Sequence, residues 1–438
     1  MSERGGKTRL GVIFLVLFID LVGFSIVFPL MERILHEYGQ QESGLYATLM
    51  GFIDNLYPKA EPLQRAALFG GILNAIYSLL QFIFAPIWGS LSDRFGRRPI
   101  LLASISGNVI AYALWAFSND FTIFVISRAV AGIMGGNLSA ATAAAADIST
   151  PATRGRSLAL VGMAFGLGFI IGPAIGGLSF HAHGDSEAAK PVGWGLHEFS
   201  APALTALALS AVNLIWALIA FHETLAPELR GKGGEARPLN PLRLFGSHLA
   251  PGVPRINFAN FCYTLLFSGM EATVVFLAAQ RMGYGPREMG MGFAAMGLTA
   301  AFVQGGIFRR QVNKVGPKVL GIAGLASLIP GFALIAAVDV WPSPTLIILG
   351  GFFLAIGSGL VFPALNTMAS LRTAATHQGL AMGAYRSAGS LGRAIGPGMA
   401  AILYFSVAPS GPYLVGAIGM LIPILLIVGL KPEASPAA

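Results

Sequence analysis

The sequence predicts an all-α integral membrane protein in which twelve transmembrane helices form two six-helix bundles. Of its 438 residues, 55% are hydrophobic and only 11% are charged, and the mean hydropathy is +0.69. Soluble domains carry about 25% charged residues. The apolar residues gather in continuous runs of the roughly 20 residues that a helix needs to cross a bilayer. A sequence pattern in the first half returns in the second half, which indicates two similar bundles.

The composition excludes several classes of protein. With 28 Lys and Arg and 20 Asp and Glu over this length, the chain lacks the polar surface of a soluble enzyme or a disordered protein. Its single cysteine, Cys262, excludes an internal disulfide framework and a multi-cysteine metal site. The sequence contains no phosphate loop, paired zinc ligands or nucleophile triad. We therefore expect no enzyme activity, no catalytic residue, no metal and no cofactor.

The apolar runs predict where each span lies. We expect helices at about 10–31, 66–90, 98–118, 121–146, 157–180, 201–221, 256–280, 288–308, 318–338, 343–366, 379–405 and 411–430. The first run follows Arg4, Lys7 and Arg9, as in a signal peptide. However, it is long, contains Asp20 and is not followed by a small-residue cleavage site, so we expect it to remain as the first span.

The positions of Lys and Arg predict the orientation of the helices. The segments on the side of the chain ends carry 19 Lys and Arg, the opposite segments carry 6, and three arginines lie inside spans. Cytoplasmic loops are rich in Lys and Arg, so both termini are predicted to lie in the cytoplasm of a multi-pass protein of the cytoplasmic (inner) membrane. The net charge of +8 is thus a topology signal, and we expect no nucleic-acid partner. The polar segment 222–255 divides an N-terminal bundle (1–221) from a C-terminal bundle (256–438).

An internal duplication supports two bundles of similar structure. Span five reads Gly-Leu-Gly-Phe-Ile-Ile-Gly-Pro through Gly172, and span eleven reads Ser-Leu-Gly-Arg-Ala-Ile-Gly-Pro through Gly396. A weaker similarity links the loops around Gly96 and Gly316. Two bundles around a central cavity suit a transporter that works by alternating access, with its substrate near the membrane midplane. A channel or a membrane enzyme does not need this symmetry.

The loop between spans two and three has a distinctive sequence. It reads Gly89-Ser-Leu-Ser-Asp93-Arg94-Phe-Gly96-Arg97-Arg98. This resembles the signature G-x-L-x-D-R-x-G-R-R of the major facilitator superfamily. Gly96 permits a tight turn and Gly89 permits close helix contact. Asp93 lies among three arginines, so we expect it to latch the two bundles when the cavity opens outward. Alternatively, Arg97 and Arg98 only set the topology.

A second glycine-rich pattern lies in span five. Its residues are Gly168, Gly172, Pro173, Gly176 and Gly177. The pattern resembles the antiporter motif of the superfamily, which implies an exporter. Glycines at this spacing also pack helices closely in many membrane proteins, and Pro173 weakens or bends the helix, so generic packing is the alternative.

Two further similarities concern protons. Arg128 and Gly132 in span four resemble the family's R-x(3)-G motif, which is tied to proton movement, and Asp20 with Pro29 resembles the D-x(8)-P pattern of drug-proton antiporters. The combination looks closest to tetracycline-resistance-like and tetracycline-transporter-like proteins. Tetracycline pumps also use an acid within the ninth span, whereas here only Asp339 lies at the outer end of that span.

Five ionisable residues lie inside predicted spans: Asp20, Arg128, Glu271, Arg386 and Arg393. A charge at the bilayer centre costs about 2.5–3.5 kcal/mol on insertion scales, so each should face a cavity or a partner. Depths along the helices match Asp20 with Arg128 and Glu271 with Arg393, which leaves Arg386 for substrate. Because arginine keeps its proton, the two acids are the predicted proton carriers and their arginines tune them. Static ion pairs that hold the helices in register are the alternative.

Several polar residues are candidates for lining the cavity beside Arg386. They are Asn74, Tyr77, Gln81, Gln304, Asn366 and Tyr385. The first three share one helix face. Each alone also fits a hydrogen bond between helices.

We therefore predict proton-coupled efflux (antiport) of an amphiphilic small molecule or drug, driven by the proton gradient. The expected partners are this substrate, protons and the lipid bilayer, and the expected form is a monomer. The alternative is a facilitator or proton symporter of an organic anion, because three intramembrane arginines stand against two acids. A membrane receptor or scaffold that transports nothing needs no ionisable residues inside its spans.

Overall fold

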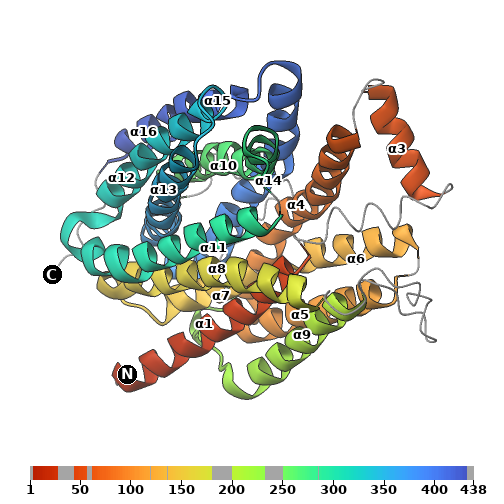
Figure 1. Ribbon diagram of the computed structural model, residues 1–438. Helices are drawn as coiled ribbons and strands as arrows, with labels where there is room; N and C mark the ends of the chain where they lie inside the picture. The colour runs from red at the N-terminus through yellow and green to blue at the C-terminus, as the bar shows by residue number, and fades with distance from the viewer. Residues whose placement is uncertain are drawn as a thin grey trace.

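A computed structural model describes residues 3–27, 44–56, 62–118, 120–135, 137–179, 200–231, 250–284 and 286–431 (Figure 1). All secondary structure in these ranges is helical. We call the side that carries the turns at Gly96 and Gly316 the inner side, and the opposite side the outer side.

The N-terminal half contains the first six predicted spans. Its helices are α1 (Glu3–Ser25), α4 (Pro62–Phe95), α5 (Arg97–Ala116), α6 (Phe121–Met134), α7 (Asn137–Asp147), α8 (Pro151–Ser179) and α9 (Ser200–Ala220). Span four thus consists of two helices, α6 and α7. A short helix, α3 (Leu45–Leu56), lies in the outer connection after span one. Pro29, which belongs to the D-x(8)-P pattern, lies outside the described residues.

The C-terminal half contains the other six spans. Its helices are α10 (Val253–Met282), α11 (Pro286–Phe302), a π-helical turn (Val303–Phe308), α12 (Arg309–Ala337), α13 (Pro344–Leu371), α14 (Gln378–Ser406), α15 (Gly411–Gly419) and α16 (Leu421–Val428). The last span is divided between α15 and α16. Short 3-10 turns at Pro227–Leu229 and Ala375–His377 follow α9 and precede α14.

In the described part of the chain, nine helical stretches are long and apolar enough to cross a membrane. The stretch Glu288–Ala337 is 50 residues long and covers two predicted spans. The apolar part of α1 is shorter, and α14 carries Arg386 and Arg393 on a helix rich in small and polar residues. All twelve predicted spans thus correspond to helices, and the chain is a multi-pass membrane protein.

The predicted loops at 91–97 and 309–317 are wrong in extent, because α4 continues to Phe95 and α12 begins at Arg309. Only Gly96 (φ 104°, ψ 161°) and Gly316 (φ 82°, ψ 155°) depart from helical geometry. This backbone region is open to glycine and strained for other residues. The weak similarity between the two loops therefore reflects the same one-residue break in each half.

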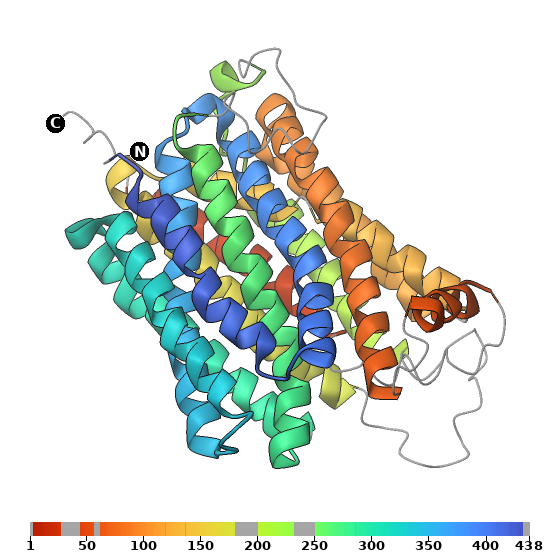
Figure 2. The same cartoon turned by 90° about the horizontal axis from the view of Figure 1, so that it is seen from above.

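The two halves meet along α4 and α14, which lie side by side in both views (Figures 1 and 2). A Cβ atom at Gly89 would overlap the carbonyl oxygen of Gly379, and a Cβ at Gly383 would lie 2.6 Å from the oxygen of Ala85. On the other flank, α8 packs against α11, α12 and α13. The contact between the halves is therefore close enough in places that only glycine fits.

Each half also has its own hydrophobic core. The aromatic residues Trp115, Phe121 and Phe124 are buried in the N-terminal half, and Phe332 and Tyr413 are buried in the C-terminal half. The aromatic residues of each core come from one half, so each half can move as a packed unit while the contact between the halves changes.

Candidate transport site and gate

Asp93 joins the two halves at the inner end of α4. Its carboxylate accepts hydrogen bonds from Gly379 N (2.9 Å) and Leu380 N (2.8 Å), which lie in the first turn of α14. These N–H groups have no partner within their own helix, and the helix dipole favours a negative charge there. Asp93 thus caps a helix of the opposite half and joins the two halves at the inner side.

Arg97 is fully buried and connects two acids. Its Nη1 donates to Asp93 Oδ1 (2.6 Å) and Ser92 Oγ (2.8 Å), and its Nε donates to Asp147 Oδ2 (2.8 Å). Such charge-assisted bonds are the strong ones, and their partners fix the position of Asp93. The sequence did not indicate Asp147, which lies at the end of α7.

Glu223, just after α9, is a second residue that the sequence did not indicate. Its carboxylate accepts hydrogen bonds from the backbone N–H groups of Arg97 (2.9 Å) and Arg98 (3.2 Å), which the break at Gly96 leaves free. The start of the linker is tied to the same loop, because Gly231 N donates to the carbonyl oxygen of Asp93 (3.2 Å).

Asp93 lies among three arginines in the sequence, but the described structure brings one of them to its carboxylate. Only Arg97 contacts its carboxylate. The exposed Arg94 lies over the ring of Phe95 at 5.1 Å, and Arg98 donates to the carbonyl oxygen of Leu218 (2.8 Å). Arg94 and Arg98 point away from Asp93, because Gly96 lies between them in the chain, ends α4 and turns the backbone.

The glycine-rich face of α8 packs against α1. A Cβ at Gly172 would overlap Ser25 Oγ, and one at Gly176 would overlap the carbonyl oxygen of Ile26. Ser25 Oγ donates to the carbonyl oxygen of Gly168 (2.9 Å). Pro173 lies inside α8 next to this contact, and Gly177 belongs to the same helix, although its surroundings fall outside what the structure describes.

The corresponding helix of the other half packs in the same way. A Cβ at Gly396 of α14 would overlap Ser268 Oγ and the carbonyl oxygen of Leu265, both on α10. The internal repeat therefore has a structural basis, because in each half a glycine before proline lies against a serine of the first span.

Asp20 and Arg128 lie in one buried cluster. Asp20 accepts a hydrogen bond from Asn108 Nδ2 (2.9 Å). The Arg128 guanidinium lies 4.8 Å from the Trp115 ring centre and 5.9 Å from that of Tyr112, and an arginine on aromatic faces tolerates loss of water. Tyr112 also packs against α1 at Gly23. The predicted partners thus share Tyr112 as a neighbour, and Asn108 was not predicted.

Arg386 lies between the two halves. Its guanidinium carbon is 4.2 Å from the ring centre of Phe165 on α8 and 5.1 Å from that of Phe362 on α13. Its Nε and Nη2 atoms are buried and have no hydrogen-bond partner among the described residues. A buried donor without a partner costs about 1–3 kcal/mol, and more when it is charged. This cation is therefore placed to receive an acceptor that the described residues do not supply.

The other predicted charges lie nearby. Glu271 on α10 and Arg393 on α14 are close enough for their charges to interact, as their depths indicated. Tyr77 lies within electrostatic reach of Asp20 and Arg128 from one half and of Arg386 and Arg393 from the other. It is therefore the point where the intramembrane charges of both halves converge.

The face of α4 formed by Asn74, Tyr77 and Gln81 lies against α14, as its spacing allowed. Asn74 Nδ2 donates to the carbonyl oxygen of Arg393 (3.4 Å), and Gln81 Oε1 accepts from Ser390 Oγ. Gln81 also donates to Tyr77 Oη (3.4 Å). These side chains therefore connect the halves beside Arg386.

The remaining candidates lie in the C-terminal half. Gln304 belongs to the π-helical turn, faces Gly162 of α8, and has a buried Oε1 without a described partner. Both polar atoms of the Asn366 amide are buried without a described partner, and Tyr385 Oη donates to the carbonyl oxygen of Phe362 (3.4 Å). Isolated π-helical turns occur often at functional sites.

Comparisons with known proteins agree with this geometry. The sequence profile of the Major Facilitator Superfamily matches residues 13–397 and 307–438. The mouse "Major facilitator superfamily domain-containing protein 10" is 32% identical, with 97% of this chain and 93% of that protein covered. The Escherichia coli "Tetracycline resistance protein, class C" is 30% identical, with 94% of each covered.

Solved structures show the same similarity. The crystal structure of the human organic anion transporter MFSD10 (TETRAN) has a TM-score of 0.86 at 28% identity and covers 98% of this chain and all of that one. The proton:xylose symporter XylE has a TM-score of 0.76 at 14% identity, over 98% of this chain and 95% of that one, which supports the fold alone. The predicted resemblance and the twelve-helix, two-bundle fold are thus confirmed. The chain is a transporter rather than an enzyme, and it belongs to the Major Facilitator Superfamily.

Proposed function

We propose that this protein carries a small organic anion across the membrane by alternating access, and that Arg386 is the main contact for the anionic group. The observation that carries the proposal is the Arg386 guanidinium, which packs against two aromatic rings and has two buried donors without a described hydrogen-bond partner. A carboxylate or sulfonate would supply the missing acceptors through charge-assisted hydrogen bonds. The human relative described as an organic anion transporter supports the same substrate class.

The position of Arg386 suits a site that changes with conformation. Phe165 and Phe362 belong to different halves, and their ring centres lie 5.1 Å apart. When the two halves separate at Arg386, one of the rings moves away from the guanidinium. The environment of the bound anion then changes. A ligand can drive a conformational change only if it binds the two states with different affinity, and this arrangement provides such a difference.

Proton coupling is the second part of the proposal. Asp20 and Glu271 are the proposed proton carriers, and Arg128 and Arg393 are their tuning partners. The proton affinity of a carboxylate depends on burial and on nearby cations. The approach of an anion to Arg393 would therefore alter the proton affinity of Glu271. The α8 glycines that resemble the antiporter motif favour exchange of substrate against protons, with export as the direction. Facilitated transport or symport of the anion is the competing mode.

The proposal also includes the arrangement in the membrane. The bundles are placed at 1–221 and 256–438 with the linker 222–255 between them, and the inner side faces the cytoplasm with both termini. The proposed functional unit is a monomer, because Arg386 and both rings that contact it belong to one chain.

The test uses the purified full chain in liposomes, with radiolabelled aromatic carboxylates, sulfonates and organic cations as substrates. We expect uptake of the anions to respond to a pH gradient and to fall more than tenfold in Arg386→Ala, which loses a charged hydrogen bond worth about 1.5–3 kcal/mol. The exposed Arg310→Ala is the control and should transport normally. A stable Arg386→Ala protein that carries the anions at the wild-type rate would rule out the anion site. Anion transport that does not depend on the pH gradient would exclude proton coupling and support facilitated transport.

A further inference from the structure

A groove on the outside of the C-terminal half lies between α10 and α16. Its volume is about 380 Å³, and it is lined by Arg255 of α10 and by Ile422, Leu425 and Leu426 of α16. Leu425 is 70% exposed and Ile422 is 50% exposed. Since α16 belongs to the last transmembrane span, these side chains face lipid. The groove is therefore apolar along the membrane and carries a cation at its inner end.

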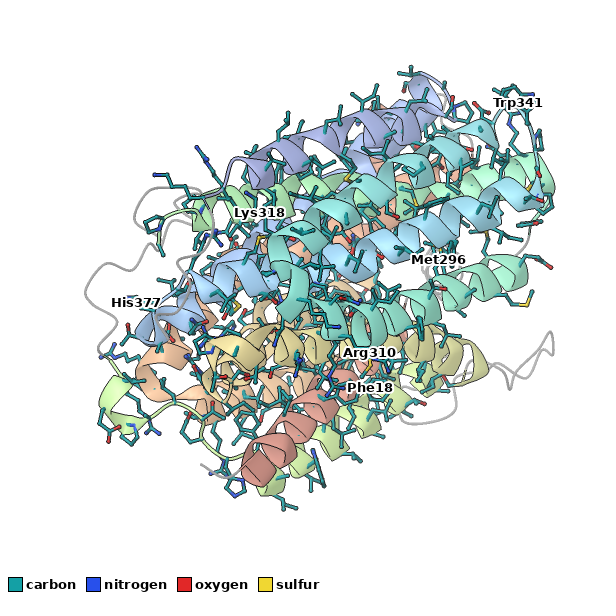
Figure 3. The ribbon with its side chains drawn as sticks, turned by 90° about the vertical axis from the view of Figure 1, so that its left-hand side faces the viewer. Phe18, Met296, Arg310, Lys318, Trp341 and His377 are labelled. Atoms are coloured by element: carbon teal, nitrogen blue, oxygen red, sulfur yellow. The ribbon has the colours of Figure 1, made fainter. Side chains whose placement is uncertain are left out.

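Cations from three helices meet at this inner end. Arg255 Nη1 donates to Gly429 O (3.1 Å), Lys318 Nζ to Leu430 O (2.6 Å), and Arg372 Nη2 to Lys431 O (2.8 Å). Figure 3 labels Lys318 near this end of α16. The carbonyl oxygens at the end of a helix attract cations, which explains why these side chains gather here.

Arg255 and Lys318 have no acidic neighbour in the described segments that carry them. The described segments 250–255 and 316–318 contain these two cations and no Asp or Glu. Carbonyl oxygens satisfy individual N–H groups, but they do not neutralise the charge. The exposed Arg255 has further donors beyond its bond to Gly429. Positive charge thus remains at the level where an apolar surface ends.

We propose that this groove binds an anionic phospholipid of the inner leaflet. Its phosphate contacts Arg255 and the neighbouring cations, and one acyl chain lies along Ile422, Leu425 and Leu426. Basic pockets between helices at the membrane surface suit anionic headgroups, because a lipid supplies the charge and the hydrocarbon together. A zwitterionic lipid supplies only the hydrocarbon, and free phosphate supplies only the charge.

The test measures binding to the purified full chain by native mass spectrometry and by thermal stability in a zwitterionic detergent. The probes are phosphatidylglycerol, phosphatidylcholine with the same acyl chains, and inorganic phosphate. We expect phosphatidylglycerol alone to bind tightly and to raise the melting temperature. Arg255→Gln should weaken its binding about fivefold, the amount that one cation contributes near an anionic surface.

Two further variants keep the test decisive. Leu425→Asn changes an exposed position of the groove, so it should leave the protein folded and still weaken the binding of phosphatidylglycerol. Arg310→Gln removes an exposed cation on the same side, which Figure 3 shows apart from Lys318, and should change nothing. Equal binding of the two lipids, full stabilisation by inorganic phosphate, or an equal loss in Arg310→Gln would each overturn the proposal.

Discussion

Several acids and arginines of this protein form groups in which neighbouring side chains bind each other. Arg97 is the clearest case, because its guanidinium satisfies both Asp93 and Asp147 in a buried site. Removing one partner of a buried ion pair is costly because it leaves an uncompensated charge. We therefore predict the effect of removing one charge at a time.

Asp93→Asn tests the latch. The asparagine keeps the shape of the side chain but loses the charge that holds Arg97 and the first turn of α14, so the inner-closed state should lose about 3–5 kcal/mol. We expect transport turnover in liposomes to fall at least tenfold while membrane insertion is retained. The exposed Arg94→Gln, which lies outside this ion-pair network, should transport normally. Wild-type turnover in a well-expressed Asp93→Asn protein would contradict the role of the latch.

Asp20→Asn tests the proton path in the N-terminal half. Asn108 can still donate to the new amide oxygen, so the local packing should survive. The side chain can no longer release a proton, so proton-driven net transport should stop while exchange of substrate across the membrane continues. Both fluxes are measured on the same liposomes. Net transport at the wild-type rate would exclude Asp20 as a proton carrier, and Glu271 would remain as the candidate.

At the scale of the helix, glycine decides how closely two elements approach. The contact between α8 and α1 brings Gly172 within reach of the backbone of α1, because a Cβ there would lie 2.6 Å from the carbonyl oxygen of Val22. Backbone cannot move aside as a flexible side chain can. Gly166 on the same helix has only ordinary contacts, with its nearest neighbour, Ala301 Cβ, at 3.5 Å.

We therefore expect Gly172→Ala to destabilise the protein by about 1–3 kcal/mol, the usual cost of overpacking. Gly166→Ala should change the stability by much less. The measurement is the melting temperature of each purified variant in the same detergent. A fall in melting temperature that is equal in the two variants would show that loss of glycine flexibility, rather than the close approach, matters.

At the scale of the whole molecule, the described structure is closed on the inner side. Asp93 caps α14, and Gly89 lies directly on Gly379, where α4 packs against α14. Because each half has its own core, this contact can open without unfolding either half. We therefore expect the contact between Asp93 and α14 to decide which state the molecule occupies.

Gly89→Ala should shift this balance, because its Cβ would overlap the carbonyl oxygen of Gly379 only in the inner-closed state. We expect the population to move toward the inward-open state, measured as a longer distance between spin labels on the inner ends of α4 and α14. Gly70→Ala, on the same helix with open space around it, is the control. An unchanged distance distribution in Gly89→Ala would contradict this account of the gate.

Local properties of the chain were enough to predict the spans and the glycine at the turn between spans two and three. A run of apolar residues is expelled from water wherever it lies, and a backbone with positive φ selects glycine without reference to distant residues. The depths of Glu271 and Arg393 also follow from helical rise alone, and the two charges do interact.

The partners of the charged residues could not be derived in this way. Asp93 accepts hydrogen bonds from backbone groups 286 and 287 residues away, and Arg386 packs against rings from α8 and α13. Phe165 and Phe362 look like any other apolar residue of a span until the halves are packed. Which helix faces which depends on the sum of many small contacts between halves, and this sum exists only in the folded molecule.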